Sequence, residues 1–426
     1  MRVREERSSG QAGRIAPIAK VSADPNPVPA GPGLGTTTIS WTTGTELLAE
    51  VYVSRDDEPE ALFARGIVGK QDASWIAAGS TYRFRLVGVG DAEDELAEVT
   101  VSREAVPWET VVEGLAVHAE DDERREEFAA LLARHVAQFA FPPLYQRYFR
   151  LFEQHGVHVT PVHFYSPVPD TRTIGDEIFA RASPLDGVDM NENAQLQLVR
   201  KVFPRFRDEY EQFSHDPTDR PYDYHFNNPQ FGGTDGVTLY CMVRHLKPKL
   251  VIEVGSGYSS MVTAAAAQRD KTTRLVCIEP HPSPTLRKGF PGLTKLIAEE
   301  VQNVEISFFE QLERDDILFI DTSHVVKTAG EVNYLFLEVL PRIKPGVVVQ
   351  VHDIFFPLEY PRQWVLDMLR FYNEQYLLQA FLAFNSEFEV LLSSSYLAHK
   401  HKEDLKRTFP KAPWWGGASL WMRRRG

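Results

Sequence analysis

Residues 251–260 read Val-Ile-Glu-Val-Gly-Ser-Gly-Tyr-Ser-Ser, and this stretch decides the fold of the C-terminal half of the chain. Its apolar start is typical of a buried strand, and the glycines that follow indicate a tight turn into a helix. Gly255 and Gly257 would let the backbone approach a ligand at the helix N-terminus. A dinucleotide fingerprint would carry a third glycine where this chain has Ser260. The acidic Glu253 before the turn suits a cationic ligand better than a pyrophosphate.

A second apolar run, residues 275–278, ends at Glu279. An acid at this place in a nucleotide-binding sheet accepts hydrogen bonds from both ribose hydroxyls of an adenosine. A glycine turn alone is common between strands and helices, so the combination with Glu279 carries the prediction of a bound nucleoside.

From residue 236 onward, apolar strand candidates alternate regularly with helices. The candidates are residues 250–254, 274–278, 295–299, 317–320, 346–351, 388–392 and 418–422. Continuous apolar runs separated by helices are typical of a parallel sheet covered on both faces. We therefore expect an α/β domain at residues 236–426, with a Rossmann-like, mainly parallel sheet of seven strands.

This half of the chain resembles the class I S-adenosylmethionine-dependent methyltransferases, on the Glu-x-Gly-x-Gly turn and the acid that ends the second strand. The resemblance implies S-adenosylmethionine as cofactor, with the turn facing its amino acid part and the acid holding its ribose. The cofactor contacts that we expect are Glu253, Gly255, Ser256, Gly257, Glu279 and Asp321. Gln302 and Asn303 fall near the adenine position of the family, although either could equally cap a helix.

Polar side chains also follow the fourth and fifth strand candidates. Asp321 and His324 follow the fourth, and His352 and Asp353 follow the fifth. Ligands of open parallel sheets lie beyond the carboxyl ends of the strands, so we expect these four side chains to converge on one cleft. Two carboxylates and two imidazoles suit acid–base or metal chemistry, and His324, His352 and Asp353 are our catalytic candidates.

More narrowly, the arrangement is similar to the metal-dependent O-methyltransferases, including those that act on macrolide sugars. In that family an aspartate ends strand four and an Asp-Asp or Asp-Asn pair follows strand five, together holding magnesium. Asp321 and Asp353 match two of these positions, but His352 stands where the family has an aspartate, and magnesium prefers oxygen ligands. A softer divalent ion on Asp321, His352 and Asp353, with His324 as a fourth ligand, is one interpretation. A metal-free site, in which His324 or His352 accepts the proton of a hydroxyl, is the other.

The chain before residue 236 divides into two predicted regions. Residues 15–105 alternate apolar and polar positions in short strands, which favours a small all-β sandwich, and the stretch at residues 79–82 resembles the tyrosine corner of immunoglobulin and fibronectin III domains. Such a domain would serve docking or dimerisation. Residues 119–235, with a helix expected to start near Asp121, read as a helical and loop region that forms a lid or acceptor pocket.

Further motifs stand at residues 163–167, 190, 227–228, 321–324, 352–353 and 374–376. On these motifs, residues 140–425 also resemble a group of bacterial class I methyltransferases whose substrates are mostly unassigned. Aromatic side chains offer contact area and a polar tip, and the candidate walls of an acceptor pocket are Tyr165, Asn228, Tyr360 and Trp364. Each could equally be core packing, since aromatic side chains serve both purposes.

Composition limits the class of partner. A length of 426 residues predicts two or three domains. The net charge of −13 disfavours a nucleic-acid substrate, and no apolar run reaches the ~20 residues of a membrane helix. The charged N-terminus lacks the apolar core of a secretory signal, and Cys241 and Cys277 imply no disulfide framework, so we expect a cytoplasmic protein.

The function that we expect is O-methylation of a hydroxyl on a sugar or secondary metabolite, and the partners that we expect are this small-molecule acceptor and further copies of the chain in a homo-oligomer. The alternatives are an oxidoreductase linked to NAD or a nucleotide-sugar, and a binding protein with an inactive Rossmann-like domain. The absent third glycine argues against the first, and the retained set of Glu253, Gly255, Gly257 and Glu279 argues against the second.

Overall fold

The computed structural model describes residues 18–29, 34–56, 58–90, 94–103, 126, 129–130, 132–133, 136–140 and 143–426. The helix start expected near Asp121 lies outside these residues. The chain divides into two units, residues 1–160 and 161–426, each with its own contacts. No helix among the described residues is long and apolar enough to cross a bilayer.

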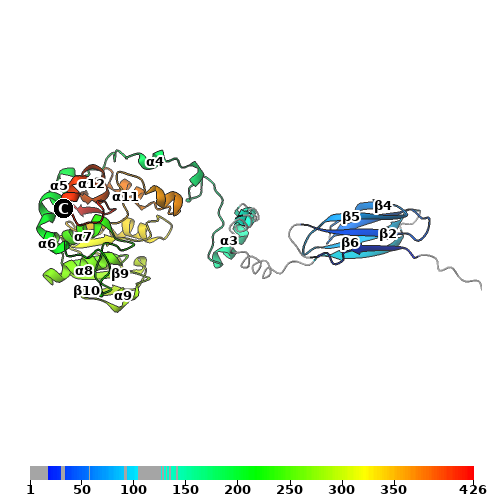
Figure 1. The fold of residues 1–426 in the computed structure, drawn as a ribbon, viewed down its shortest axis with the longest axis horizontal. Coiled ribbons are helices and arrows are strands. Elements are labelled where there is room, and N and C mark those ends of the chain that lie inside the picture. The colour runs from blue at the N-terminus through cyan, green and yellow to red at the C-terminus, as the bar shows by residue number, and fades with distance from the viewer. Residues whose placement is uncertain are drawn as a thin grey trace, which may run out of the picture. The chain divides into compact units, whose positions relative to one another are not determined.

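The first unit contains a sandwich of two antiparallel sheets (Figure 1). One sheet has the order β1 (Lys20–Asp24), β2 (Gly35–Thr42), β5 (Val68–Ile76). The other has the order β4 (Ala61–Arg65), β3 (Ala49–Arg55), β6 (Thr81–Gly88), β7 (Glu95–Ser102). Alternate residues such as Ile39 and Phe84 are buried between the sheets, as the period of a strand requires. The all-β sandwich predicted for this part of the chain is confirmed.

Tyr82 closes one corner of this sandwich. Its hydroxyl accepts a hydrogen bond from the backbone N–H of Ala77 at 3.1 Å and donates to the carbonyl of Trp75 at 3.4 Å. A tyrosine that bonds back to the backbone a few residues upstream is the contact that defines a tyrosine corner. Beyond the sandwich, the structure describes η1 (Gln138–Ala140) and α3 (Leu144–Gln154) in this unit.

A large sheet forms the centre of the second unit (Figure 1). Among the described residues its order is β10 (Leu293–Ile297), β9 (Arg274–Ile278), β8 (Leu250–Val254), β11 (Ile317–Ile320), β12 (Val348–Val351), β14 (Leu420–Arg424), β13 (Phe388–Ser393). The strands from β10 to β12 pair in parallel, whereas β14 runs antiparallel to both of its neighbours. The predicted α/β class with a mainly parallel sheet is therefore confirmed.

Helices cover both faces of this sheet. Ile252 of β8 belongs to the apolar cluster that includes residues of η7 (Tyr334–Val339) and α11 (Glu374–Leu382). Its neighbour Val251 belongs to the cluster that includes residues of α7 (Gly233–Leu246) and α8 (Tyr258–Asp270). Successive residues of a strand point to opposite faces, so an unbroken apolar strand fills two cores.

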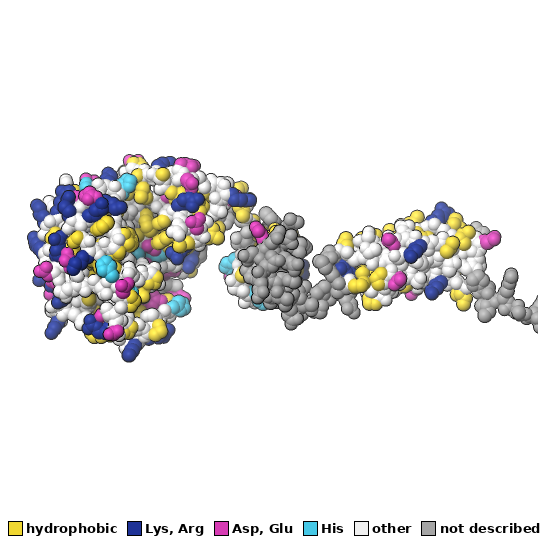
Figure 2. Space-filling view, in the orientation of Figure 1, with side chains coloured by type: hydrophobic (Ala, Val, Ile, Leu, Met, Phe, Trp, Pro, Cys, Tyr) yellow, Lys and Arg dark blue, Asp and Glu magenta, His cyan; other side chains and the backbone are white. Residues whose placement is uncertain are grey.

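Shorter elements complete the second unit. They are η2 (Thr171–Thr173), α4 (Glu177–Ala180), α5 (Glu192–Gln197), η3 (Leu198–Val202), η4 (Phe203–Phe206), α6 (Arg207–Tyr210), α9 (Pro284–Lys288), η5 (Val301–Asn303), η6 (Ile306–Phe308), α10 (Glu331–Asn333), η8 (Gln363–Asp367), α12 (Ser394–Lys400) and α13 (Lys402–Thr408). Figure 2 shows basic and acidic side chains interspersed over the face of this unit that it presents.

Candidate active site

A cavity of about 600 Å³ opens at the carboxyl ends of the parallel strands. The loop after β8 lines it with Gly255, Ser256 and Gly257, and the end of β9 lines it with Glu279. The ends of β11 and β12 add the predicted polar set, Asp321, His324, His352 and Asp353. The structure thus brings nearly all of the predicted site residues to one cavity, where an open parallel sheet places its ligands.

The glycine loop lies tightly against the neighbouring strand. Gly255 has a φ of +77°, and a Cβ at this position would collide with the backbone carbonyl of Asp321. Only glycine satisfies both conditions at low cost. Gly257 is the N-cap of α8, and its backbone N–H donates to the hydroxyl of Ser260 at 3.1 Å. The loop therefore presents bare backbone to the cavity.

Glu253 lies behind this loop. Its side chain is fully buried, and Oε1 accepts hydrogen bonds from the hydroxyls of Ser259 and Ser260, each at 2.7 Å. It is not among the residues that line the cavity. Burial raises the pKa of Glu253 to about 8, although both serine hydroxyls act in the opposite direction. In this structure Glu253 holds the first turn of α8 through these two serine hydroxyls.

The buried Glu253 predicts a pH dependence of stability. Its folded pKa of about 8 exceeds its ordinary value of 4.5, so the stability that it gives as a neutral acid is full below pH 4.5 and is lost as pH rises toward 8. The free energy of unfolding should therefore fall by up to about 1.4 kcal/mol per pH unit across this window, and Glu253→Gln should remove that slope. Urea titrations of both proteins at several pH values measure it; equal slopes would contradict the prediction.

Glu279 directly follows β9, at the wall of the cavity. Oε1 accepts the backbone N–H of His281 at 2.7 Å, and Oε2 accepts the backbone N–H of Ser256 at 3.3 Å. A carboxylate oxygen has two lone pairs, so both oxygens can accept a further donor from the cavity. The half-buried Glu279 is thereby held in one orientation beside the glycine loop.

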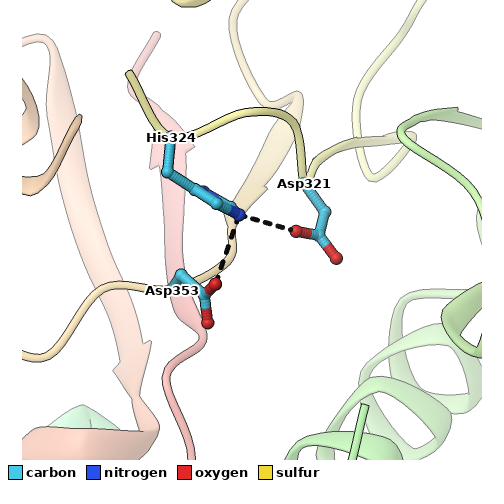
Figure 3. Close-up of side chains that lie close together, drawn as sticks. All are labelled: Asp321, His324 and Asp353. Atoms are coloured by element: carbon cyan, nitrogen blue, oxygen red, sulfur yellow. Dashed lines mark ion pairs between the residues drawn. The ribbon is translucent and has the colours of Figure 1, made fainter. Parts of the chain in front are cut away.

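Asp321, His324 and Asp353 all line the cavity, and their side chains point toward one another (Figure 3). Nε2 of His324 lies 3.3 Å from Oδ1 of Asp321 and 3.2 Å from Oδ2 of Asp353. One ligand atom of each residue lies within 4.8 Å of the others, a spacing that could hold a metal ion. His324 and Asp353 both have left-handed backbones, with φ of +60° and +56°. Such conformations cost energy in residues other than glycine and cluster at functional sites.

Each imidazole of the site has a further carboxylate behind it. Nδ1 of His324 lies 2.9 Å from Oε2 of Glu374, which is 1% exposed at the start of α11. Nε2 of His352 lies 3.4 Å from Oδ2 of Asp235, in the first turn of α7. The other nitrogen of His352 lies 3.4 Å from Oδ1 of Asp353. The sequence did not predict Asp235 as a site residue and gave Glu374 no role beyond the family resemblance of residues 374–376, because neither residue stands at a strand end.

The charges of this cluster depend on one another. Burial lowers the pKa of both imidazoles, but the surrounding carboxylates outweigh it, raising the pKa of His324 to about 10 and that of His352 well above its usual value. Burial alone would raise the pKa of Asp321, but His352 and His324 hold it below its usual value. Burial raises the pKa of Asp353 and of Glu374. Since four carboxyl groups surround two imidazoles, the site favours added positive charge.

Of the four residues predicted to line an acceptor pocket, two line the cavity and two do not. Asn228 and Trp364 line the cavity. Tyr360 is buried away from it, and its hydroxyl accepts the backbone N–H of Gln375 at 3.0 Å. Tyr165 is 85% exposed and lines no part of the cavity. Three wall residues that the sequence did not single out are Arg370, Tyr372 and Trp414.

The adenine position expected from the sequence is not part of this cavity. Gln302 and Asn303 belong to η5 and are absent from its lining among the described residues. The side chain of Gln302 donates to Glu300 at 2.9 Å.

Comparison with known proteins matches residues 252–354 to a family described as "Methyltransferase domain". The chain is 30% identical to an uncharacterized protein of Archaeoglobus fulgidus over 166 residues, which are 37% of this chain and 75% of that protein. Among solved structures, an O-methyltransferase family 2 protein of Planctomyces limnophilus in complex with apigenin is 14% identical, with a TM-score of 0.22, over 55% of this chain and 61% of that one. A human fibronectin type III domain is 13% identical, with a TM-score of 0.16, over 23% of this chain and 94% of that one.

Proposed function

We propose that this chain, which belongs to the same family as the Archaeoglobus fulgidus protein and carries a methyltransferase domain, transfers the methyl group of S-adenosylmethionine to a hydroxyl of a small-molecule acceptor. One observation carries the proposal: a single cavity joins the glycine loop and Glu279 to the carboxylate–imidazole cluster. A cofactor site and an acid–base site then share one space, as group transfer requires. A sugar or secondary metabolite fits this reaction as acceptor.

Backbone groups and carboxylates of the chain would bind S-adenosylmethionine. The loop from Gly255 to Gly257 offers bare backbone for close approach, and Glu279 offers its oxygens to the ribose hydroxyls. Asp321 belongs to the cluster, and its backbone carbonyl lies against Gly255 of this loop, so its negative charge would attract the sulfonium.

The cluster also fits a divalent metal ion, which we propose as a second cofactor. Asp321, His324 and Asp353 would hold it, and Glu374 behind His324 would fix the ring. Metal-binding histidines commonly give their other nitrogen to a carboxylate in this way. One imidazole with two carboxylates suits manganese or zinc better than magnesium. When bound, such an ion would supply a Lewis acid for the acceptor hydroxyl.

The remaining imidazole is placed to take the proton. In the proposed reaction the acceptor oxygen forms a bond to the methyl carbon, the carbon–sulfur bond breaks, and S-adenosylhomocysteine leaves as a neutral thioether. The hydroxyl proton passes to Nδ1 of His352, while Asp235 beside Nε2 stabilises the imidazolium. His352 can accept this proton only in its neutral form, and the surrounding carboxylates raise its pKa well above the usual value. A cation held by Asp321 and Asp353, which lie 3.6 Å and 3.4 Å from Nδ1, would offset these carboxylates and lower that pKa.

Glu279→Ala tests the cofactor side. Loss of the ribose acceptor should weaken S-adenosylmethionine binding by about tenfold or more, because each charge-assisted hydrogen bond contributes about 1.5–3 kcal/mol. Calorimetric titration of the metal-stripped protein measures the affinity. Glu300→Ala is the matched control, since Glu300 lies outside the cavity lining. Unchanged affinity in Glu279→Ala would contradict the assignment.

The same titration tests the competing enzyme class. Wild-type protein should bind S-adenosylmethionine and not NAD, because the loop lacks the third glycine of a dinucleotide site. Binding of NAD alone would favour the oxidoreductase, and binding of neither ligand would favour the inactive binding protein.

A further inference from the structure

The charges that line the cavity are unevenly divided. Asp235, Glu279, Asp321 and Asp353 contribute carboxylates, whereas Arg370 contributes the guanidinium among the described lining residues. Within the described part of the chain, Arg370 forms no ion pair. An arginine that faces a cavity without a carboxylate partner keeps its N–H groups available for an anion from solution.

Arg370 is nevertheless held in place. Its guanidinium carbon lies 5.1 Å from the centre of the Trp364 ring, a cation–π distance, and its backbone N–H donates to the carbonyl of Trp364 at 2.8 Å. Stacking uses the face of the guanidinium and leaves its edge free to donate hydrogen bonds.

An aromatic wall connects Arg370 to the reactive cluster. The Trp364 ring lies 5.8 Å from that of Tyr372, and the Tyr372 ring lies 4.8 Å from that of His324. Both aromatic residues line the cavity. A molecule with its hydroxyl at the cluster would therefore contact Tyr372 and Trp364 before it reaches Arg370.

We propose that Arg370 binds an anionic group of the acceptor, a carboxylate or a phosphate, while the hydroxyl of the same molecule points to the cluster. The inference rests on the proposed function and names its substrate class: acidic hydroxyl compounds such as hydroxyaryl carboxylates, uronic acids or sugar phosphates. The segment that carries Arg370 follows β12, whereas the glycine loop follows β8, and β11 lies between these strands. This placement assigns Arg370 to the acceptor rather than to the carboxylate of the cofactor.

The test compares probes that differ in charge and little in shape. Protein saturated with S-adenosylhomocysteine is titrated with 3,4-dihydroxybenzoate and 3,4-dihydroxybenzamide, and separately with glucose 6-phosphate and glucose. In the wild type, at least one charged probe should bind about tenfold or more tightly than its neutral counterpart. The pair that shows the preference distinguishes a carboxylate from a phosphate.

Arg370→Gln should remove this preference, and Arg370→Lys should keep part of it because a point charge remains. Arg362→Gln is the matched control: Arg362 pairs with Asp176 and does not line the cavity, so the preference should survive. Absence of any charge preference in the wild type, or its survival in Arg370→Gln, would overturn the proposal. A tenfold loss of S-adenosylhomocysteine affinity in Arg370→Gln would overturn it too, by assigning Arg370 to the cofactor.

The binding measurements distinguish failure of the methyltransferase proposal from failure of the acceptor subsite. Wild-type protein that does not bind S-adenosylmethionine overturns the methyltransferase proposal. Wild-type protein that binds S-adenosylmethionine but shows no charge preference overturns only the acceptor subsite.

Discussion

Replacing Asp353 by asparagine is expected to lower turnover by about 1,000-fold, the order of effect that a metal or acid–base group contributes. Asp353 places one oxygen 3.2 Å from Nε2 of His324 and the other 3.4 Å from Nδ1 of His352, so it contacts both imidazoles. Asparagine keeps the shape but removes the charge that holds a cation. S-adenosylmethionine affinity should change by less than about threefold, because Asp353 lies beyond the proposed cofactor contacts.

Two measurements separate these effects. Calorimetry gives the affinity for S-adenosylmethionine, and formation of S-adenosylhomocysteine with the charged probes gives turnover. Asp367→Asn is the matched control, since Asp367 is an exposed acid that pairs with Arg362. Turnover of Asp353→Asn near the wild-type level would show that the cluster is structural.

Glu374→Gln is expected to weaken manganese or zinc binding by about 10- to 100-fold, as removal of a carboxylate behind a metal-binding histidine usually does. Oε2 of Glu374 lies 2.9 Å from Nδ1 of His324, and glutamine would bond to this nitrogen without charge. Calorimetric titration with each metal measures the effect and needs no acceptor. Glu359→Gln is the control, because Glu359 bonds to the hydroxyl of Tyr376 outside the cavity.

The same variant distinguishes the two interpretations of the cluster. If Glu374 orients a metal ligand, metal affinity falls together with turnover. If Glu374 instead orients His324 as a metal-free base, turnover falls, while the wild type and the variant alike show no saturable metal binding. The metal titration therefore decides between them even before the acceptor is known.

Strand positions could largely be predicted from the sequence, because unbroken apolar runs have few alternatives to a buried parallel strand. The bounds of β8, β9 and β11 agree with the predicted residues. The predicted fifth strand began two residues early, at Gly346, because this glycine has a φ of +90° and belongs to the preceding turn. The antiparallel direction of β14 could not be predicted from its residues, because the direction of strand pairing is set by topology rather than by residue type.

The site residues that stand just after a strand could be predicted from the sequence. Glu279, Asp321 and Asp353 reach the cavity because the carboxyl ends of parallel strands meet at one edge. Glu374 and Asp235 enter through the first turns of α11 and α7, whose position depends on packing between distant segments. Glu253 was expected to face a ligand, and the sequence could not reveal that two serine hydroxyls would bind its carboxylate instead.

The place of β14 has a consequence for synthesis on the ribosome. This strand separates β12 from β13, and the backbone N–H of Ala418 just before it donates to Oδ2 of Asp235 at 2.7 Å. Until residues 418–424 emerge, β12 has no neighbour on that side and Asp235 lacks this donor. Pairing between segments so far apart in sequence forms late, because the intervening chain must first be closed into a loop. Nascent chains that lack this segment should therefore expose the edge of β12, to which chaperones can bind. Methyltransferase activity should appear only after β14 has joined the sheet.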